Sequence, residues 1–260
     1  MKLYLNYIKV QIKTAMEYKF NTFLMAIASA LSSFAAVFGV YLLFGKYTSV
    51  GGYGFNEVLI TFSMVLTVFS ISEMVFRGFD QFDKLVRHGE LDRLLIRPRS
   101  IFMQVLGIKI EFSKIGRIVL GITLLIYALI NSTIEWNYLK IIVVILMIFS
   151  GVVIYLSIYL LSSSFTIFTI EGAEVINIFT NGGREVCTYP LDIYKKFFKM
   201  FFTFVIPLAC FNYIPLKFLL EEAGSVSIFY ALFPLASILF FIPSILIFNW
   251  SMKHYKSTGS

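Results

Sequence analysis

Long apolar runs separated by short polar stretches make up most of the chain. Six runs carry no charge or almost none: residues 20–44, 58–76, 118–134, 141–170, 200–216 and 223–252. A helix needs about 20 mostly apolar residues to cross the hydrocarbon core of a bilayer. The pattern therefore predicts an all-α polytopic membrane protein with six transmembrane helices.

In the first run, small residues recur at Ala28, Ser32 and Ala36, a spacing that favours close helix packing within the chain or between two copies.

The composition agrees with a membrane protein. Hydrophobic residues make up 58% and charged residues 14% of the 260 positions, against about 45–50% and about 25% in soluble domains. The longest polar interval, residues 77–117, is shorter than the roughly 50 residues that an independent domain needs. We therefore expect one transmembrane domain over residues 1–260, with no room for an ATP-hydrolysing domain.

Basic residues are distributed unevenly over the predicted loops. If the amino terminus is cytoplasmic, 19 of the 22 lysines and arginines lie on the inner side, and only Lys46, Lys140 and Lys217 lie outside. Short cytoplasmic loops are enriched in such residues. The count predicts that both termini are cytoplasmic and that the basic stretch at residues 184–199 lies inside. Residues 1–19 are expected to form an amphipathic helix on the inner membrane surface.

Residues suited to catalysis or metal binding are scarce. His88 and His254 are isolated and far apart, and Cys187 and Cys210 have 22 residues between them, so neither pair has the spacing of a metal or redox motif. The glycines before Lys46 do not have the spacing of a phosphate-binding loop. We predict no catalytic residue, no metal site and no cofactor bound by this chain, which is therefore not expected to be an enzyme.

Glu73 is the charged residue of the second apolar run. It stands four residues before Arg77, so an ion pair on one helical face would satisfy it, and a proton relay is the alternative. Glu171 and Glu174 follow the fourth run and are expected at the inner boundary, or within a polar fifth helix if that run ends earlier.

The interval 77–117 predicts a helix, a break and a second helix. Apolar residues at helical spacing are followed by Gly89, and a short helix can run from Glu90 to Arg97 before Pro98 ends it. Leu91, Leu94 and Leu95 would form an apolar patch on this second helix. Such an element either fits a groove on a partner protein or lies in the membrane interface.

Two stretches resemble a known family. Residues 89–98, Gly-Glu-Leu-Asp-Arg-Leu-Leu-Ile-Arg-Pro, resemble the loop signature of the ABC-2 type transporter permeases, and most closely that of small six-span bacterial membrane subunits. Residues 189–194, 204–209 and 212–215 resemble the carboxyl-terminal half of that branch. Together with the pattern of spans, the resemblance covers nearly the whole chain.

The resemblance implies the permease subunit of an ABC exporter in the bacterial cytoplasmic membrane, moving a hydrophobic or amphipathic cargo. A separate ABC ATPase subunit would bind ATP and magnesium, and a second permease chain, identical or homologous, would complete the membrane unit. No nucleic-acid partner is implied. The coupling helix would lie within residues 87–99, and the residues expected to contact the ATPase are Arg87, Glu90, Leu91, Asp92, Leu94, Leu95, Arg97 and Pro98.

Two alternatives stay open. In the wider superfamily the region before the last span re-enters the membrane from outside, so residues 186–222 with Pro207 and Pro215 form either a plain fifth span or such a hairpin. The basic residues at 184–199 favour the plain span. A proton- or ion-coupled secondary transporter is the other function considered; it predicts charges deep within spans.

Overall fold

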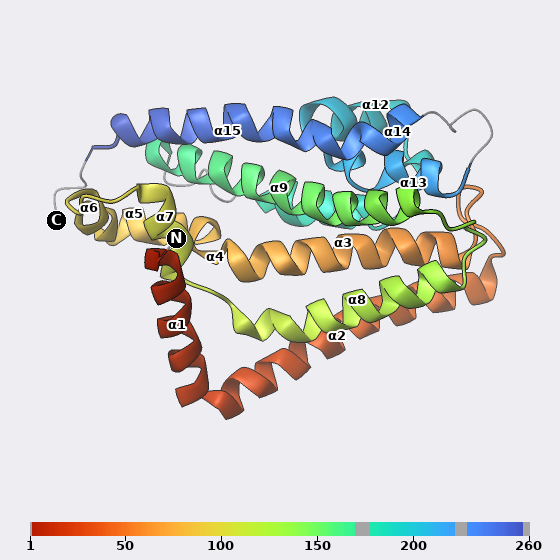
Figure 1. Ribbon diagram of the computed structural model, residues 1–260, viewed down its shortest axis with the longest axis horizontal. Coiled ribbons are helices and arrows are strands. Elements are labelled where there is room, and N and C mark those ends of the chain that lie inside the picture. The colour runs from red at the N-terminus through yellow and green to blue at the C-terminus, as the bar shows by residue number, and fades with distance from the viewer. Residues whose placement is uncertain (1, 170–176, 222–227, 257–260) are drawn as a thin grey trace.

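The computed structural model describes residues 2–169, 177–221 and 228–256, and throughout these ranges the regular structure is helical. Five apolar helical segments are long enough to cross a membrane and run along the long axis of the molecule (Figure 1). They are α2 (Lys19–Lys46), α3 (Phe55–Val75), η1 with α8 (Phe112–Lys114 and Ile115–Ile130), α9 (Tyr138–Phe168), and α14 through η6 to α15 (Ile228–Leu232, Phe233–Leu235 and Ala236–Lys253). These confirm the all-α membrane fold and five of the six predicted spans.

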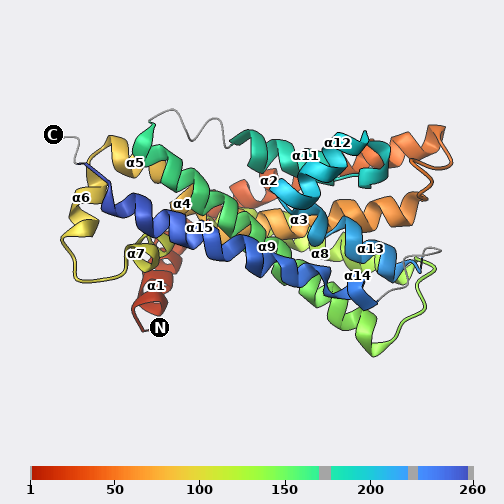
Figure 2. The same cartoon turned by 90° about the horizontal axis from the view of Figure 1, so that it is seen from above.

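The core of the bundle lies around α3 and α9. Helix α3 is mostly buried, and it packs against α2, α8 and α9, while α9 packs against α15 along most of its length (Figure 2). Most of α2 is exposed and apolar. The small residues Ala28, Ser32 and Ala36 are also exposed, so this face does not pack within the chain, and packing between two copies stays a prediction.

The predicted fifth span, residues 200–216, is not a straight helix. Two apolar segments, Lys196–Val205 and Leu208–Leu219, meet at an angle of 86°. The first contains α12 (Lys196–Met200) and η4 (Phe201–Val205), and the second contains η5 (Leu208–Cys210) and α13 (Tyr213–Leu219). The break falls at Ile206, whose backbone is extended (φ −123°, ψ 95°), because the ring of the following Pro207 disfavours the helical conformation there.

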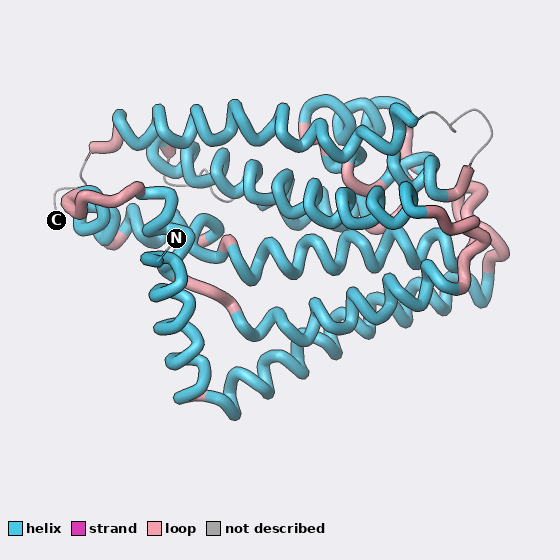
Figure 3. The backbone as a smooth tube through the Cα atoms, in the orientation of Figure 1, coloured by secondary structure: helices cyan, strands magenta, loops and turns pink. Residues whose placement is uncertain are grey.

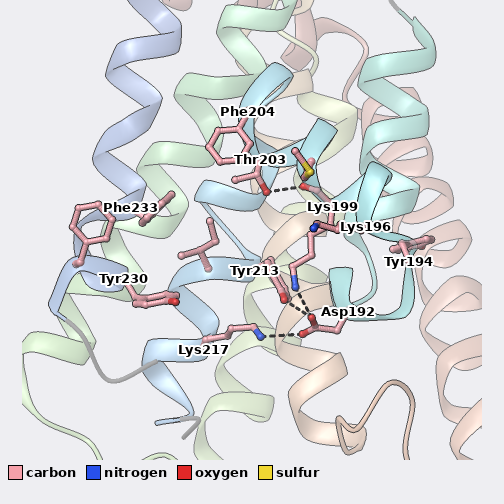
Figure 4. Close-up of a pocket in the computed structure, with 13 residues that line it drawn as sticks. Asp192, Tyr194, Lys196, Lys199, Thr203, Phe204, Tyr213, Lys217, Tyr230 and Phe233 are labelled. Carbon is pink, nitrogen blue, oxygen red and sulfur yellow. Dashed lines mark hydrogen bonds and ion pairs between the residues drawn. The ribbon is translucent and has the colours of Figure 1, made fainter. Parts of the chain in front are cut away.

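The two arms of this bent segment begin and end at the same end of the bundle. Lys199 on the first arm and Lys217 on the second both bind the carboxylate of Asp192, at 2.7 and 3.1 Å (Figure 4). The residues near the bend, from Leu208 to Phe211, are buried. The segment is therefore a re-entrant hairpin, as the second of the two interpretations of residues 186–222 expects, and not a plain span.

A different stretch makes the fifth pass along the bundle. The end of α9 lies beside the segment that follows α3, since the Ser163 hydroxyl donates to the carbonyl of Phe79 at 3.2 Å. Asp192, in contrast, accepts a hydrogen bond from Tyr53, just before α3. The chain passes between these ends through η2 (Ile178–Gly182), α11 (Gly183–Cys187) and η3 (Leu191–Ile193).

The path of this fifth pass contradicts the predicted location of one basic stretch. The basic stretch at residues 184–199 was expected on the same side as residues 77–117, yet Lys199 lies with Tyr53 and Lys217 at the opposite end. Charge counting assumed that a segment with polar and basic residues does not cross. Here Arg184 sits within the bundle over the ring of Phe69, 4.9 Å from its centroid. Glu171 and Glu174 fall outside the described residues.

Helix α1 (Lys2–Glu17) forms as expected and turns sharply into α2 near Tyr18 (Figure 1). The Gln11 side chain donates to the carbonyl of Ile108 at 2.5 Å, which attaches α1 to the polar segment after α3. Helix α1 and the end of α15 lie toward the same end of the bundle (Figure 3), the arrangement that an even number of passes produces.

Candidate functional site

Four short helices cap the end of the bundle that follows α3. They are α4 (Arg77–Asp80), α5 (Phe82–Arg87), α6 (Glu90–Leu95) and α7 (Ile101–Ile108). Gly89 separates α5 from α6 with a left-handed backbone (φ 67°), a conformation that glycine adopts without steric cost. The predicted helix, break and helix are therefore present. Helix α6 ends at Leu95 rather than at Arg97, because Pro98 disfavours helical geometry at the residue before it.

The apolar stripe on α4 and α5 faces the bundle. Phe79 and Phe82 are buried against Phe248 of α15, with ring centroids 5.7 and 6.1 Å apart. Leu85 and Val86 are buried as well. A displacement of α5 would therefore act directly on α15, so the segment is mechanically connected to a membrane-spanning helix.

The surface of α6 differs from the expected one. Leu91 and Leu94 are buried, so their side chains hold α6 in place and are not available to a partner; their predicted position on the surface is wrong. The exposed apolar side chains of this region are those of Leu95 and Ile96, and the side chain of Ile96 is 83% exposed. Around them the exposed predicted residues are Arg87, Glu90, Arg97 and Pro98, with Asp92 half-buried.

Gln104 on α7 is a positioning residue that the sequence reasoning missed. Its buried side-chain amide donates to the carbonyl of Leu94 at 3.0 Å and to that of Arg99 at 3.1 Å. These bonds fix the chain that follows α6. The signal was a single amide side chain among the apolar residues of 101–108, which a polar-satisfaction argument would have selected.

Glu73 is satisfied by partners other than the predicted one. Its carboxylate pairs with Arg117 at the start of α8 and with Lys114, 3.5 Å away. Arg77 turns instead to Asp80 and to Glu111, whose Oε2 lies 3.1 Å from the arginine Nε. The prediction of an ion pair for Glu73 was right in kind but wrong in partner, because tertiary contacts with α8 outweigh the local spacing.

The ion pairs of α4 lie beside a cavity of about 400 Å³ between α3, α4, α5, α9 and η2. Burial raises the pKa of the Asp80 carboxyl despite the neighbouring Arg77. For Glu111, burial acts in the same direction, but Lys109, Ser113 and Arg77 outweigh it and lower its pKa. Three acidic and three basic side chains line the cavity: Glu73, Asp80 and Asp83, and Arg77, Lys84 and Arg87.

A second polar cluster lies at the opposite end of the bundle around Asp192 (Figure 4). Its carboxylate accepts hydrogen bonds from the hydroxyls of Tyr53 and Tyr213 and pairs with Lys199 and Lys217. Burial alone would raise the pKa of Asp192. The hydrogen bonds from the four partners outweigh it and hold this pKa well below its usual range.

Comparison with known families decides the broader assignment. A family described as ABC-2 family transporter protein matches residues 30–259. The chain belongs to the ABC-2 transporter family. A comparison with curated protein sequences finds no match.

Membership of the ABC-2 family makes this chain the multi-pass membrane component, or permease subunit, of an ABC transporter. Permeases of this family work in general with an ABC ATPase. The match includes α3, the α4–α7 segment, the re-entrant hairpin and α15. The resemblance seen in residues 89–98 and 189–215 is thereby confirmed at the level of the family.

Proposed function

We propose that this ABC-2 permease belongs to an ATP-driven exporter and that α6 with the residues after it contacts a separate ATPase subunit. The observation that carries the proposal is an exposed apolar pair, Leu95 at the end of α6 and Ile96 directly after it, on a helix whose Leu91 and Leu94 are buried. An exposed apolar pair, surrounded by charged side chains and held on a rigid base, suits a groove on another protein. ATP and magnesium would bind to that partner.

The α4–α7 segment would transmit the ATPase cycle to the spans. A ligand shifts a conformational equilibrium only through its differential affinity for the two states. The ATP-bound and ATP-free partner would therefore hold α6 in two positions. Movement would reach α15 through the packing of Phe79 and Phe82 on Phe248, and α3 and α8 through Arg77, Glu111 and the pairs of Glu73.

In this proposal the α4–α7 end and both termini are cytoplasmic, in a bacterial cell membrane, and α1 lies along the inner headgroups. Fifteen lysines and arginines belong to the three segments at the α4–α7 end, residues 2–19, 77–117 and 253–256. Six lie toward the other end: Lys46, Lys140, Lys195, Lys196, Lys199 and Lys217. This revised distribution still supports the predicted orientation, since cytoplasmic loops are enriched in lysine and arginine.

A second permease chain would pack on the exposed face of α2 that carries Ala28, Ser32 and Ala36, where small side chains let two helices approach closely in lipid. Cysteine cross-linking tests this contact in the membrane. An Ala36→Cys variant should form a cross-linked dimer. Ile145→Cys, on an exposed apolar position of α9, should not, and equal cross-linking of both would contradict the contact.

The coupling surface is tested by purifying the tagged chain from its native membrane in mild detergent. Wild type should retain a companion with a phosphate-binding loop of the Walker type, which mass spectrometry identifies. Replacing Leu95 and Ile96 together with aspartate should abolish that companion while leaving membrane insertion intact. Tyr138→Asp, at an 89% exposed position at the other end of the bundle, should retain it.

Two outcomes would overturn the proposal in different ways. Retention of the ATPase by the Leu95 and Ile96 variant would remove α6 as the contact surface while leaving the permease role intact. Purification of the wild-type chain alone, across several detergents, would instead support a secondary transporter.

A further inference from the structure

A cavity of about 780 Å³ opens between the re-entrant hairpin and the α14–η6 segment, at the end of the bundle that carries Asp192 (Figure 4). This volume lies within the range of about 300 to 1,000 Å³ that small-molecule sites occupy. The walls come from η3, both hairpin arms and the start of the last span. The cavity is separate from the α4–α7 segment and takes no part in the proposed contact with the ATPase.

One part of the cavity is cationic. Lys196, Lys199 and Lys217 line it together with the single carboxylate of Asp192, so three positive charges face one negative charge. Lys199 and Lys217 are held in place by that carboxylate, and the ammonium of each also lies 4.8 Å from the centre of the Tyr213 ring. Among the described residues, no carboxylate forms a salt bridge with Lys196. Counted over the described residues that line the cavity, the excess is two positive charges.

The other part of the cavity is apolar and aromatic. Phe204, which is 77% exposed, and Phe233 line it, together with Met200 and Ile214. Figure 4 shows Phe204 at the far side of the cavity from Lys217 and Asp192, with Phe233 on the flank formed by the last span. An elongated ligand would therefore meet fixed positive charge at one end and aromatic side chains at the other.

We propose that this cavity binds an anionic amphiphile, with a phosphate or carboxylate headgroup at Lys196, Lys199 and Lys217 and a hydrocarbon chain along Phe204 and Phe233. The excess positive charge favours an anionic headgroup over a zwitterionic one, whose own cation would face the lysines. Lysines at the membrane–water boundary place their ammonium groups at the level of lipid headgroups. The exposed rings supply the apolar surface that a chain needs.

The test uses the full-length chain in a neutral maltoside detergent, with binding measured from ligand-induced thermal stabilisation. Dodecyl phosphate should bind at least about tenfold more tightly than dodecyl phosphocholine, which has the same chain and a headgroup of zero net charge. Lys196→Gln should weaken the binding of dodecyl phosphate by about fivefold, the effect of one unit charge at about 4 Å in water. Lys195→Gln, which removes the same charge from a neighbour that does not line the cavity, should leave the affinity unchanged.

A second variant separates the chain from the headgroup. Phe204→Ala should weaken the binding of both dodecyl compounds, because it removes apolar contact without changing the charge of the cavity. Equal affinity for the two compounds, or equal weakening by Lys195→Gln and Lys196→Gln, would overturn the proposal.

The source of the amphiphile is a separate outcome of the same experiment. Lipid extracts of wild type and Lys196→Gln, both purified from the native membrane, are compared by mass spectrometry. A bilayer phospholipid such as phosphatidylglycerol, depleted in Lys196→Gln, would identify a resident lipid. Depletion of an anionic amphiphile that is not a bilayer component would identify a transported molecule. A full set of anionic lipids unchanged by Lys196→Gln would count against the site.

Discussion

The Tyr53 hydroxyl donates a hydrogen bond of 2.8 Å to the carboxylate of Asp192, joining residues 139 positions apart. Tyr53 lies in the turn between α2 and α3, and Asp192 lies where the irregular fifth pass reaches the re-entrant hairpin. Through Lys199 and Lys217 the same carboxylate also holds both arms of that hairpin. One acidic side chain thus connects three segments that the bilayer does not force together.

We expect Asp192→Asn to destabilise this end of the fold. The substitution keeps the size of the side chain but removes the charge that two lysines and two tyrosines share, and charged hydrogen bonds contribute about 1.5 to 3 kcal/mol each. A loss of about 2 kcal/mol should appear as a lower thermal midpoint in detergent. Glu185→Gln removes a carboxylate that is mostly exposed and should change stability by less than about 0.5 kcal/mol. Equal effects would show that the Asp192 cluster adds no particular stability.

The same residue predicts how stability depends on pH. The pKa of Asp192 is lower in the folded chain than its ordinary value, so its contribution is fully present above the ordinary value of about 4 and is lost as the pH falls below it. The difference in thermal midpoint between wild type and Asp192→Asn should be constant from pH 7 to about pH 5 and should shrink below about pH 4. A difference that grows on acidification would contradict the assignment.

The sequence predicted the spans but not the path between the last two. Apolar runs report burial in lipid, and five of them became spans. Residues 200–216 are equally apolar, yet the re-entrant hairpin also lies in the bundle, so composition does not distinguish it from a span. What decides the path is the meeting of Lys199, Lys217 and Tyr53 at Asp192, a long-range contact that no local pattern encodes.

In the α4–α7 segment, too, the sequence predicted some features and not others. Gly89 and Pro98 marked the limits of α6 from the sequence, because their backbone preferences are local. The leucines did not reveal which side of α6 faces outward, since α6 is only six residues long and packs against both α5 and α7. In the proposed contact with the ATPase, the exposed Leu95 and Ile96 therefore take the place of Leu91 and Leu94.

A double-mutant cycle should reveal the true partner of Glu73. The side chains of Glu73 and Arg117 are only 12% and 11% exposed, and removing one member of a buried pair costs about 3 to 5 kcal/mol. Glu73→Gln and Arg117→Gln should therefore be coupled by about 2 kcal/mol or more in unfolding experiments in detergent. Glu73→Gln and Arg77→Gln should be coupled clearly less strongly, because these two side chains form no ion pair with each other. Strong coupling to Arg77 would restore the local i to i+4 pair.

Gly78 should be required for the close packing of α4 on α7. A Cβ atom at this position would collide with the backbone carbonyl of Val105 on α7. Because the colliding atom belongs to the backbone, no change of side-chain rotamer can relieve the collision. We expect Gly78→Ala to destabilise the chain by about 2 kcal/mol, within the range for overpacked sites, although alanine favours a helix by about 1 kcal/mol over glycine. Gly45→Ala provides the matched control, because a Cβ there meets nothing within 4 Å, and should be neutral or slightly stabilising.

If the α4–α7 segment also carries the contact with the ATPase, co-purification of that subunit should fall in Gly78→Ala and stay constant in Gly45→Ala. Unchanged thermal stability of Gly78→Ala would show that α4 and α7 can separate at little cost, which contradicts a rigid base for α6.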